Sequence, residues 1–275
     1  MKKIQILFSL IAAMLFVFAC TSDNFSDKYT GGGGGNEPVG GQADTLAYFA
    51  LNGSLTNSVA DSDCRLFLYG QEAYASGGFD GSQALMLDGK TNYLAIPLGE
   101  HDTLSVVFWA KMAENTFWRK NSEPVWLDYG AGAVSFSLQS GTMNPDGYSE
   151  ATKLLITDAA GEAPAAHLLP AGPEWNNICT WKNRVFFCAE ITADYIKCRV
   201  KAKYEEGNNP KDYNIAIDKS QSLLETKPEW LYIGKPSGLG DAKGKYLEGI
   251  IHDIYIYNRG LTSKELESFA QVSLE

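Results

Sequence analysis

Apolar and polar residues alternate with a period of two in several stretches of the chain, and each stretch is bounded by Gly, Asn, Asp or Pro. Because successive side chains of a β-strand point to opposite faces of its sheet, this period predicts strands with one buried face. Examples are Tyr93–Ile96, Leu104–Ala110, Val134–Leu138, Lys153–Thr157, Val185–Ile191, Trp230–Ile233 and Ile250–Tyr257.

A helical pattern is found only near the end of the chain, from Thr262 to Gln271. Thr262 is expected to cap this helix, and Glu265 three residues later completes a capping box. Leu266 and Phe269 then lie on one face. There is no internal repeat of solenoid or propeller period. The pattern predicts an all-β fold closed by one short helix.

Two Asp-Gly pairs, at 80–81 and 88–89, lie between apolar runs and predict tight turns, for which Gly89 is expected to adopt a positive φ. Large rings are usually buried and contribute strongly to the core. The aromatic residues expected to fill the core are Trp109, Trp126, Tyr129 and Trp175.

The beginning of the chain has the features of an export signal. Lys2 and Lys3 precede an apolar run, Ile4–Ala19, which is too short and wrongly flanked for a stable membrane span. The run ends in Val-Phe-Ala-Cys, which resembles the bacterial lipobox, in which the cysteine becomes acylated. Residues 1–19 are therefore predicted to be a lipoprotein signal peptide, and Cys20 the lipid-bearing residue that anchors the chain to a membrane.

A polar, Gly-rich segment, residues 20–43, follows and offers few side chains to bury. It predicts a flexible tether that leads into one domain, residues 44–275. The polar start with Ser22 and Asp23 resembles the signals of surface-exported lipoproteins of the Bacteroidetes. An outer membrane location, surface-exposed or periplasm-facing, is expected.

The composition narrows the class of partner. Hydrophobic residues make up 45% of the chain, charged residues 20%, and there are 27 glycines, as suits a sheet protein with many turns. The net charge of −10, without a lysine patch, argues against nucleic acid and anionic lipid surfaces as ligands. Neutral glycans, cations and proteins are left as partners.

Five blocks of sequence resemble, in order, the landmarks of the laminin G-like, concanavalin A-like family. The last block is the most specific, because its glycine, Tyr-Asn-Arg and Leu-Thr-x-x-Glu elements are close to the family's ending. The blocks are YFALNGSLTNS (48–58), GGFDGSQALMLDGKTNYLAIP (77–97), LSVVFWAKM (104–112), EWNNICTWKN (174–183) and LYIGKPSG…KYLEGIIHDIYIYNRGLTSKEL (231–266).

The resemblance implies a two-sheet antiparallel jelly-roll β-sandwich, with Trp109 and Trp175 as structural tryptophans. It also implies binding of glycans or proteins. The segment from Phe117 to Pro173 matches poorly, and loops of this kind carry individual function.

The cysteines allow several arrangements. With Cys20 acylated, four remain, an even number with three connectivities, in a compartment where disulfides persist. Cys188 and Cys198 are expected to face each other across a three-residue turn at 192–194, or Cys188 to face Cys179. Buried free thiols are the alternative. The four candidates are Cys64, Cys179, Cys188 and Cys198.

Motifs for catalysis are missing from the sequence. The laminarinase-type relatives use a Glu-x-Asp-x-x-Glu strand, and neither that pattern nor Gly-x-Ser-x-Gly, His-Glu-x-x-His or a P-loop is present. His252 and Asp253 are neighbours, but strict alternation would point their side chains to opposite faces. Ile250, Ile254 and Ile256 would then share a face with His252. A non-enzymatic protein is expected.

The candidate ligand site is the stretch MAENTFWRKNSEP, whose aromatic residues are the hardest to assign to a core. Trp118 and Phe117 are expected to stack on sugar rings, while Arg119, Asn121 and Glu123 supply hydrogen bonds. The alternative is that Trp118 packs under its own loop.

A structural Ca²⁺ ion is a second expectation, since many relatives hold one near the chain ends. Asp253 is the candidate ligand, with Asn52 or Asp80 as partners.

The sequence as a whole predicts a non-catalytic, lipid-anchored envelope protein that binds carbohydrate. Adhesion or scaffolding through a protein partner is the first alternative, and an unrecognised glycoside hydrolase the second.

Overall fold

The computed structural model describes most of the chain from residue 44 onward. The described residues are 44–78, 81–99, 101–114, 124–131, 134–139, 153–157, 165–167, 184–204, 207–218, 229–236 and 245–272.

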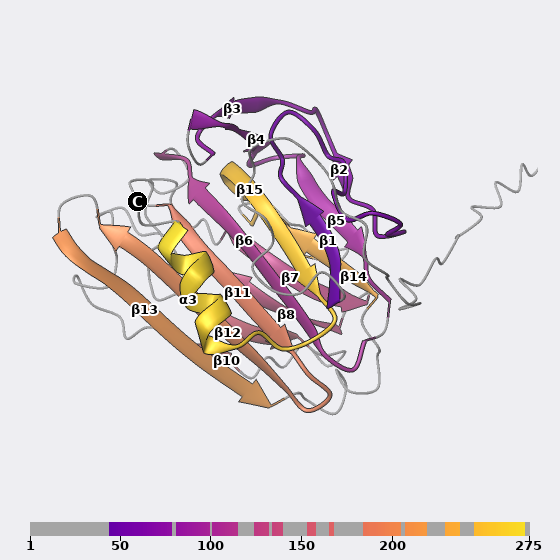
Figure 1. Cartoon of the computed structure of the whole chain (residues 1–275), viewed down its shortest axis with the longest axis vertical. Coiled ribbons are helices and arrows are strands. Elements are labelled where there is room, and N and C mark those ends of the chain that lie inside the picture. Colours follow the sequence, from indigo (N-terminus) through magenta and orange to yellow (C-terminus); the bar gives the residue numbers. More distant parts are fainter. Residues whose placement is uncertain are drawn as a thin grey trace, which may run out of the picture.

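Two antiparallel sheets form the two layers of a sandwich (Figure 1). The first sheet has eight strands in the order β13-β12-β11-β6-β15-β4-β3, and β1 also pairs with β15. Its strands are β1 (Thr45–Phe49), β3 (Tyr74–Ser76), β4 (Gln83–Asp88), β6 (Leu104–Met112), β11 (Val185–Ile191), β12 (Tyr195–Tyr204), β13 (Gly207–Asp218) and β15 (Glu248–Tyr257).

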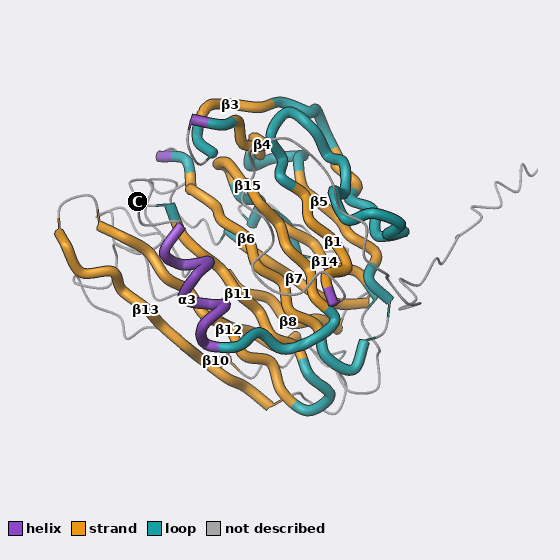
Figure 2. Tube along the Cα trace, viewed as in Figure 1, coloured by secondary structure: helices purple, strands orange, loops and turns teal. Residues whose placement is uncertain are grey.

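The second sheet has seven strands in the order β10-β9-β8-β7-β14-β5-β2. Its strands are β2 (Phe67–Tyr69), β5 (Tyr93–Pro97), β7 (Val125–Ala131), β8 (Val134–Gln139), β9 (Lys153–Thr157), β10 (Ala165–His167) and β14 (Trp230–Ile233). Every stretch with a two-residue period is a strand, and the predicted fold class is confirmed. Loops gather around β2 and β3 at one end of the sandwich (Figure 2).

The main core fills the space between the sheets. Phe187 of the first sheet stacks on Phe108 at 5.0 Å between ring centroids and meets Trp126 of the second sheet at 4.7 Å. Trp126 and Tyr129 are both buried, as predicted. Burial of each such side chain stabilises the fold by about 2 kcal/mol or more.

Helix α3 (Ser263–Val272) covers part of the outer face of the first sheet (Figure 1). Phe269 packs on Trp109 and Tyr255 in a second apolar cluster, with Leu266 beside it. Trp109 is therefore a core residue as predicted, but it lies beneath this helix rather than between the sheets. No helix in the described part of the chain is long and apolar enough to span a membrane.

The predicted capping box starts this helix. The Thr262 N–H donates to Glu265 Oε2 at 2.8 Å, and the Glu265 N–H donates to Thr262 Oγ1 at 3.3 Å. Glu265 also accepts from Arg259, and this bond lowers the pKa of the carboxyl to about 2. The charged carboxylate therefore stays paired at neutral pH.

The predicted turns have the expected backbone. Gly89 adopts φ 69° and Gly81 φ 76°, values that favour glycine. At the β4–β5 turn, the Asp88 carboxylate accepts from the N–H groups of Lys90, Thr91 and Asn92, and with Thr91 Oγ1 these bonds hold its pKa well below the usual range.

Of the arrangements that the sequence left open, the Cys188–Cys198 disulfide is wrong, and the alternative of buried free thiols is confirmed for these two residues. Ile191 pairs with Ile196, so Cys198 lies opposite Ala189, and Cys188 lies opposite Arg199. This register differs by one residue from the one expected for a three-residue turn, and a one-residue slip moves a side chain to the other face. Cys198 accordingly faces the main core, whereas Cys188 lies in the cluster under α3. Cys179 lies outside the described residues.

A substitution of Gly249 would test how closely β15 packs against β6. A Cβ at this position would lie 2.1 Å from the carbonyl oxygen of Lys111. Gly249→Ala is expected to lower the free energy of unfolding by about 3 kcal/mol, because rigid backbone must move. Gly81→Ala meets nothing within 4 Å, so as a control it should cost only about 1 kcal/mol of φ strain. Urea denaturation measures both, and equal losses would contradict this packing.

Candidate functional site

The outer face of the second sheet carries a group of large aromatic side chains. Along β14, Leu231 and Ile233 are buried in the main core, so Trp230 and Tyr232 point outward. Strand β5 follows the same alternation, with Tyr93 outward. The cross-strand register places Tyr69 opposite Tyr93, and Phe67 and Tyr232 on either side of Ala95.

The rings touch in a continuous series. Tyr69 stacks on Tyr93 at 4.5 Å between centroids, and Tyr93 lies 6.2 Å from Tyr232. Trp230 lies 6.3 Å from Tyr232 and 6.3 Å from Phe67. Tyr246 adds a contact with Tyr93 at 6.3 Å. We call this surface the aromatic face, and its residues are Phe67, Tyr69, Tyr93, Trp230, Tyr232 and Tyr246.

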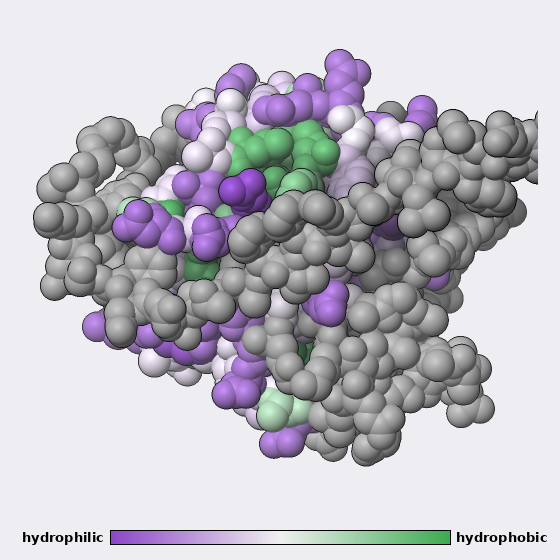
Figure 3. Space-filling view, turned by 90° about the vertical axis from the view of Figure 1, so that its right-hand side faces the viewer, coloured by the Kyte–Doolittle hydropathy of each residue, from purple (hydrophilic) through white to green (hydrophobic). Residues whose placement is uncertain are grey.

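The aromatic face is open to solvent at its margin. Phe67 is 43% exposed and Tyr69 is 46% exposed, the highest values among the large hydrophobic residues of the described chain. Both lie on β2, which is the edge strand of this sheet among the described residues, so no described strand covers one side of each ring. The side of the molecule at the right of Figure 1 shows an apolar patch framed by hydrophilic residues (Figure 3).

Small residues lie between the rings. Ala95 is fully buried although it shares the outward side with Phe67 and Tyr232, so these rings cover it. Gly130 of β7 lies opposite Trp230 and adds no side chain beside the indole. The rings, rather than the strands between them, therefore form the contact surface.

Two charged groups accompany the rings. Lys235 Nζ lies 4.5 Å from the centroid of Tyr93 and 5.6 Å from that of Tyr232. Asp128 lies opposite Tyr232 and is only 2% exposed. Burial lowers the pKa of Lys235, and the charge of Asp128 opposes that shift. Burial also raises the pKa of Tyr93 and of Tyr232, so both phenols are neutral donors at physiological pH.

This combination suits recognition of rings with one apolar face. Aromatic side chains supply large, rigid contact area, while phenol hydroxyls and an ammonium supply hydrogen bonds at the edges. No side chain has to move to expose Phe67 or Tyr69.

A second polar group lies on the outer face of the first sheet, at a bulge in β15. His252 pairs with Trp109 and Tyr255 with Val107, so two residues of β15 face the single residue Phe108. Asp253, inside the bulge, has φ 53°, an unusual conformation for a residue other than glycine.

The bulge corrects the predicted alternation of this strand. Ile251 and Ile254 are both buried in the main core, although they are three residues apart, and Ile256 joins them. His252 instead shares the opposite face with Tyr255. The expected common face for Ile250, His252, Ile254 and Ile256 is wrong, because the extra residue shifts the phase by one.

His252 and Asp253 do not point apart as strict alternation predicted. His252 Nδ1 lies 2.9 Å from Asp253 Oδ2, and the Tyr48 hydroxyl donates to Asp253 Oδ1 at 2.8 Å. His252 is buried beside Trp109, with ring centroids 6.0 Å apart. Burial lowers the pKa of His252 even though Asp253 opposes the shift, so the imidazole is neutral at pH 7.

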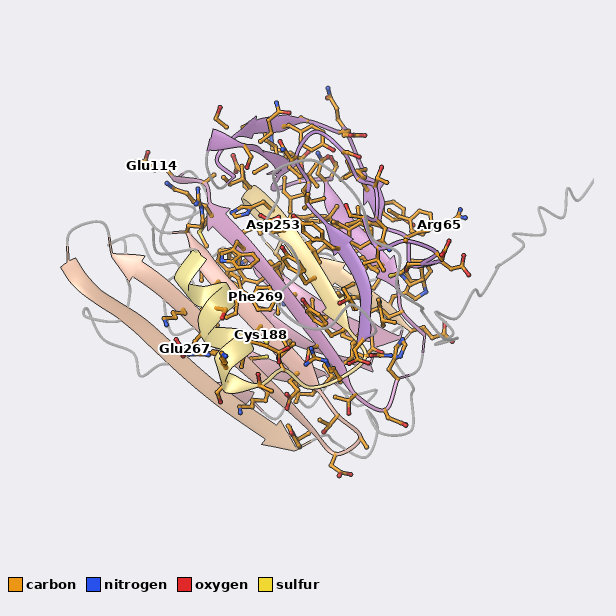
Figure 4. All side chains as sticks on the ribbon, in the orientation of Figure 1. Arg65, Glu114, Cys188, Asp253, Glu267 and Phe269 are labelled. Atoms are coloured by element: carbon orange, nitrogen blue, oxygen red, sulfur yellow. The ribbon has the colours of Figure 1, made fainter. Side chains whose placement is uncertain are left out.

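Arg184 completes this group. Its Nη2 donates to the carbonyl oxygen of Gly77 at 2.7 Å, and its charge acts on both Asp253 and His252. The bulge thereby links β1, β15 and the residues before β4 and β11. In Figure 4, Asp253 lies on the first sheet, away from the helix residues Glu267 and Phe269.

Asn52 and Asp253, two of the predicted calcium ligands, bind different partners in the structure. Asn52 Oδ1 accepts from the Gln83 N–H at 2.9 Å, whereas both oxygens of Asp253 are engaged by Tyr48 and His252. In the described ranges there is no group of three or more His, Cys, Asp or Glu that could hold a metal ion. Asp80 lies outside those ranges, and the calcium site stays a prediction.

The predicted ligand residues also lie outside the described residues. They are Phe117, Trp118, Arg119, Asn121 and Glu123. Trp175, predicted to be a structural tryptophan, and Cys20, predicted to bear the lipid, lie outside the described residues as well.

The aromatic face was missed by sequence reasoning, although a signal exists. In WLYI and YLAIP the aromatic residues Trp230, Tyr232 and Tyr93 occupy the positions that alternate with buried aliphatic residues. A strand whose outward positions are aromatic rather than polar indicates a contact surface.

The fold is similar to that of solved botulinum neurotoxin binding domains. The binding domain of serotype D/C VPI 5993 has a TM-score of 0.57 at 9% identity, over 84% of this chain and 52% of that one. The serotype DC domain in complex with SialylT has a TM-score of 0.55 at 10% identity, over the same shares. The DC domain in complex with rat synaptotagmin II gives 0.54 at 11%, again over 84% and 52%.

At such identities the likeness concerns the fold, and the chain spans about half the length of these domains. No protein-family model and no curated protein matches the sequence. The predicted jelly-roll sandwich is confirmed, while membership of the laminin G-like family stays a prediction.

The buried imidazole of His252 gives a testable pH dependence. Its pKa in the folded chain lies below the usual value of about 6.5, so below that pH the unfolded chain binds more protons. The free energy of unfolding is expected to fall as pH drops from 7 to 5, and to fall less in His252→Asn. Urea denaturation at both pH values measures this, and equal slopes for the two proteins would contradict it.

Proposed function

We propose that this chain is a non-catalytic carbohydrate-binding module of the bacterial cell envelope, and that the aromatic face is its binding surface. The observation that carries the proposal is the continuous series of rings on the outer side of β2, β5 and β14, with two of them more than 40% exposed. A series of aromatic rings that faces solvent indicates an interaction surface. The flat rings match the apolar faces of sugar rings.

The similar solved structures support this class of function. They are binding domains, and one of them is described in complex with SialylT. The hydrogen-bonding groups at the margin, the phenols of Tyr93 and Tyr232 and the ammonium of Lys235, suit the hydroxyls of a glycan.

Binding of a protein partner is the second candidate function. The observation in its favour is that Phe67 and Tyr69 lie on an edge strand, whose free backbone groups are able to pair with an added strand. One of the similar domains is described in complex with rat synaptotagmin II. In that role the chain is an adhesion or scaffolding module.

Trp230 is the residue to test, because it touches both Phe67 and Tyr232. Trp230→Ala is expected to weaken glycan binding about 30-fold, the effect of removing a central aromatic contact worth about 2 kcal/mol. Met86→Ala is the matched control, since Met86 is 41% exposed on the first sheet.

The measurement is a glycan array followed by isothermal titration with the best-binding oligosaccharide. Equal binding by wild type and Trp230→Ala would contradict the proposed surface. Absence of glycan binding, together with saturable binding of a purified envelope protein that is lost in Trp230→Ala, would favour the protein-binding role.

The anchor is part of the same proposal. With Cys20 acylated, residues 20–43 tether the domain to the outer membrane. Cys20→Ser is expected to abolish incorporation of labelled palmitate and to move the protein from the membrane fraction to the soluble fraction. Cys188→Ser is the control, and unchanged labelling in Cys20→Ser would refute the anchor.

A further inference from the structure

Lys235 is turned toward the aromatic face by a break in the strand. Ile233 is buried in the main core, so strict alternation would send Lys235 inward as well. Gly234, between them, has φ 89°, and a Cβ there would lie 2.6 Å from Leu87. Glycine adopts this backbone conformation without strain, and the resulting turn brings the Lys235 ammonium over Tyr93 and Tyr232 instead.

The ammonium keeps its hydrogen-bonding capacity. A lysine ammonium has three N–H donors, and within the described chain no hydrogen bond or ion pair engages Lys235 Nζ. Its contacts are the two ring faces, at 4.5 and 5.6 Å, which attract the charge without accepting a conventional hydrogen bond. The donors are therefore available to a bound molecule.

The charge of Asp128 acts on Lys235 from a buried position. Asp128 is buried in β7, opposite Tyr232, and acts on Lys235 through its charge. It supports the protonated state of the lysine from within the sheet, while Lys235 remains partly exposed. A ligand on the aromatic face thus meets the ammonium first.

We propose that the aromatic face selects acidic glycans, with Lys235 pairing with the carboxylate of a uronic acid whose neighbouring ring stacks on the aromatic residues. This inference rests on the proposed glycan-binding function and names its ligand class. A carboxylate accepts a charge-assisted hydrogen bond from the ammonium, and such bonds are roughly twice as strong as bonds between two neutral groups. The negative charge of the carboxylate adds an attraction to the ammonium that the hydroxyl of the reduced sugar lacks. The partial burial of the lysine protects the pair from screening.

The preference has to act against the overall charge of the protein. The chain carries a net charge of −10, which repels polyanions at low ionic strength. At 0.15 M salt the Debye length is about 8 Å, so this long-range repulsion is screened whereas the contact at Lys235 persists. The selectivity for acidic glycans is therefore expected to increase as salt is raised from 0.01 to about 0.15 M.

The test compares each acidic oligosaccharide with its carboxyl-reduced form, in which the carboxylate becomes a hydroxymethyl group and the linkages are kept. Oligosaccharides of polygalacturonate, alginate and hyaluronan are titrated into the full-length protein at 0.15 M salt. Wild type is expected to bind at least one acidic form about tenfold more tightly than its reduced form. Lys235→Met should abolish that ratio, because it weakens binding of the acidic form much more than binding of the reduced form.

Two control variants separate charge from packing. Lys235→Arg keeps the positive charge and should retain the preference. Lys264→Met removes an exposed lysine on α3, on the other side of the sandwich, and should leave all affinities unchanged.

The outcomes distinguish this inference from the function on which it rests. Equal affinity for acidic and reduced forms, no binding of any acidic form, or a ratio that survives Lys235→Met would overturn the selectivity. If neutral glycans still bind and Trp230→Ala removes that binding, the proposed function stands without the selectivity. If neither glycan class binds, both fail.

Discussion

Burial of apolar side chains between the two sheets decides which residues are left for the outer faces, because each strand has only two sides. Leu94, Ile96, Leu231 and Ile233 occupy the interior, and the side chains that alternate with them must face solvent. The first sheet uses its outer face to hold α3 over Trp109 and Phe186. The described part of the second sheet presents Trp230, Tyr232 and their neighbours instead.

Two interruptions of the strand alternation place the polar groups. The bulge at Asp253 brings two consecutive side chains into contact and gathers Tyr48 and Arg184 around them. Gly234 turns Lys235 outward over two rings. Bulges are over-represented next to functional sites because they re-aim side chains that regular strands cannot place. A glycine of positive φ allows a similar change of direction. Gly234 therefore gives the aromatic face a positioned cation, Lys235. The bulge at Asp253 links β15 rigidly to β1 and to Arg184.

The regular elements were predictable from the sequence, and the interruptions were not. Period-two alternation is local, so strands such as Leu104–Met112 and Val185–Ile191 were found, as was the Thr262–Glu265 capping box. The bulge at Asp253 leaves no composition signal, since the residue is neither Gly nor Asn. The one-residue change of register after Ile191 likewise separated Cys188 from Cys198. The aromatic face was not predicted because its residues are spread along the sequence between positions 67 and 246. Only the strand order brings them together.

The central claim is that ligand binds the outer side of β2, β5 and β14. A crystal structure of the chain with a bound oligosaccharide tests this most directly. The account predicts a sugar ring in van der Waals contact with Trp230 and Phe67, and a polar group of the sugar within hydrogen-bond distance of Lys235 Nζ. An oligosaccharide bound instead against the first sheet, around Asp253 and His252, would contradict it.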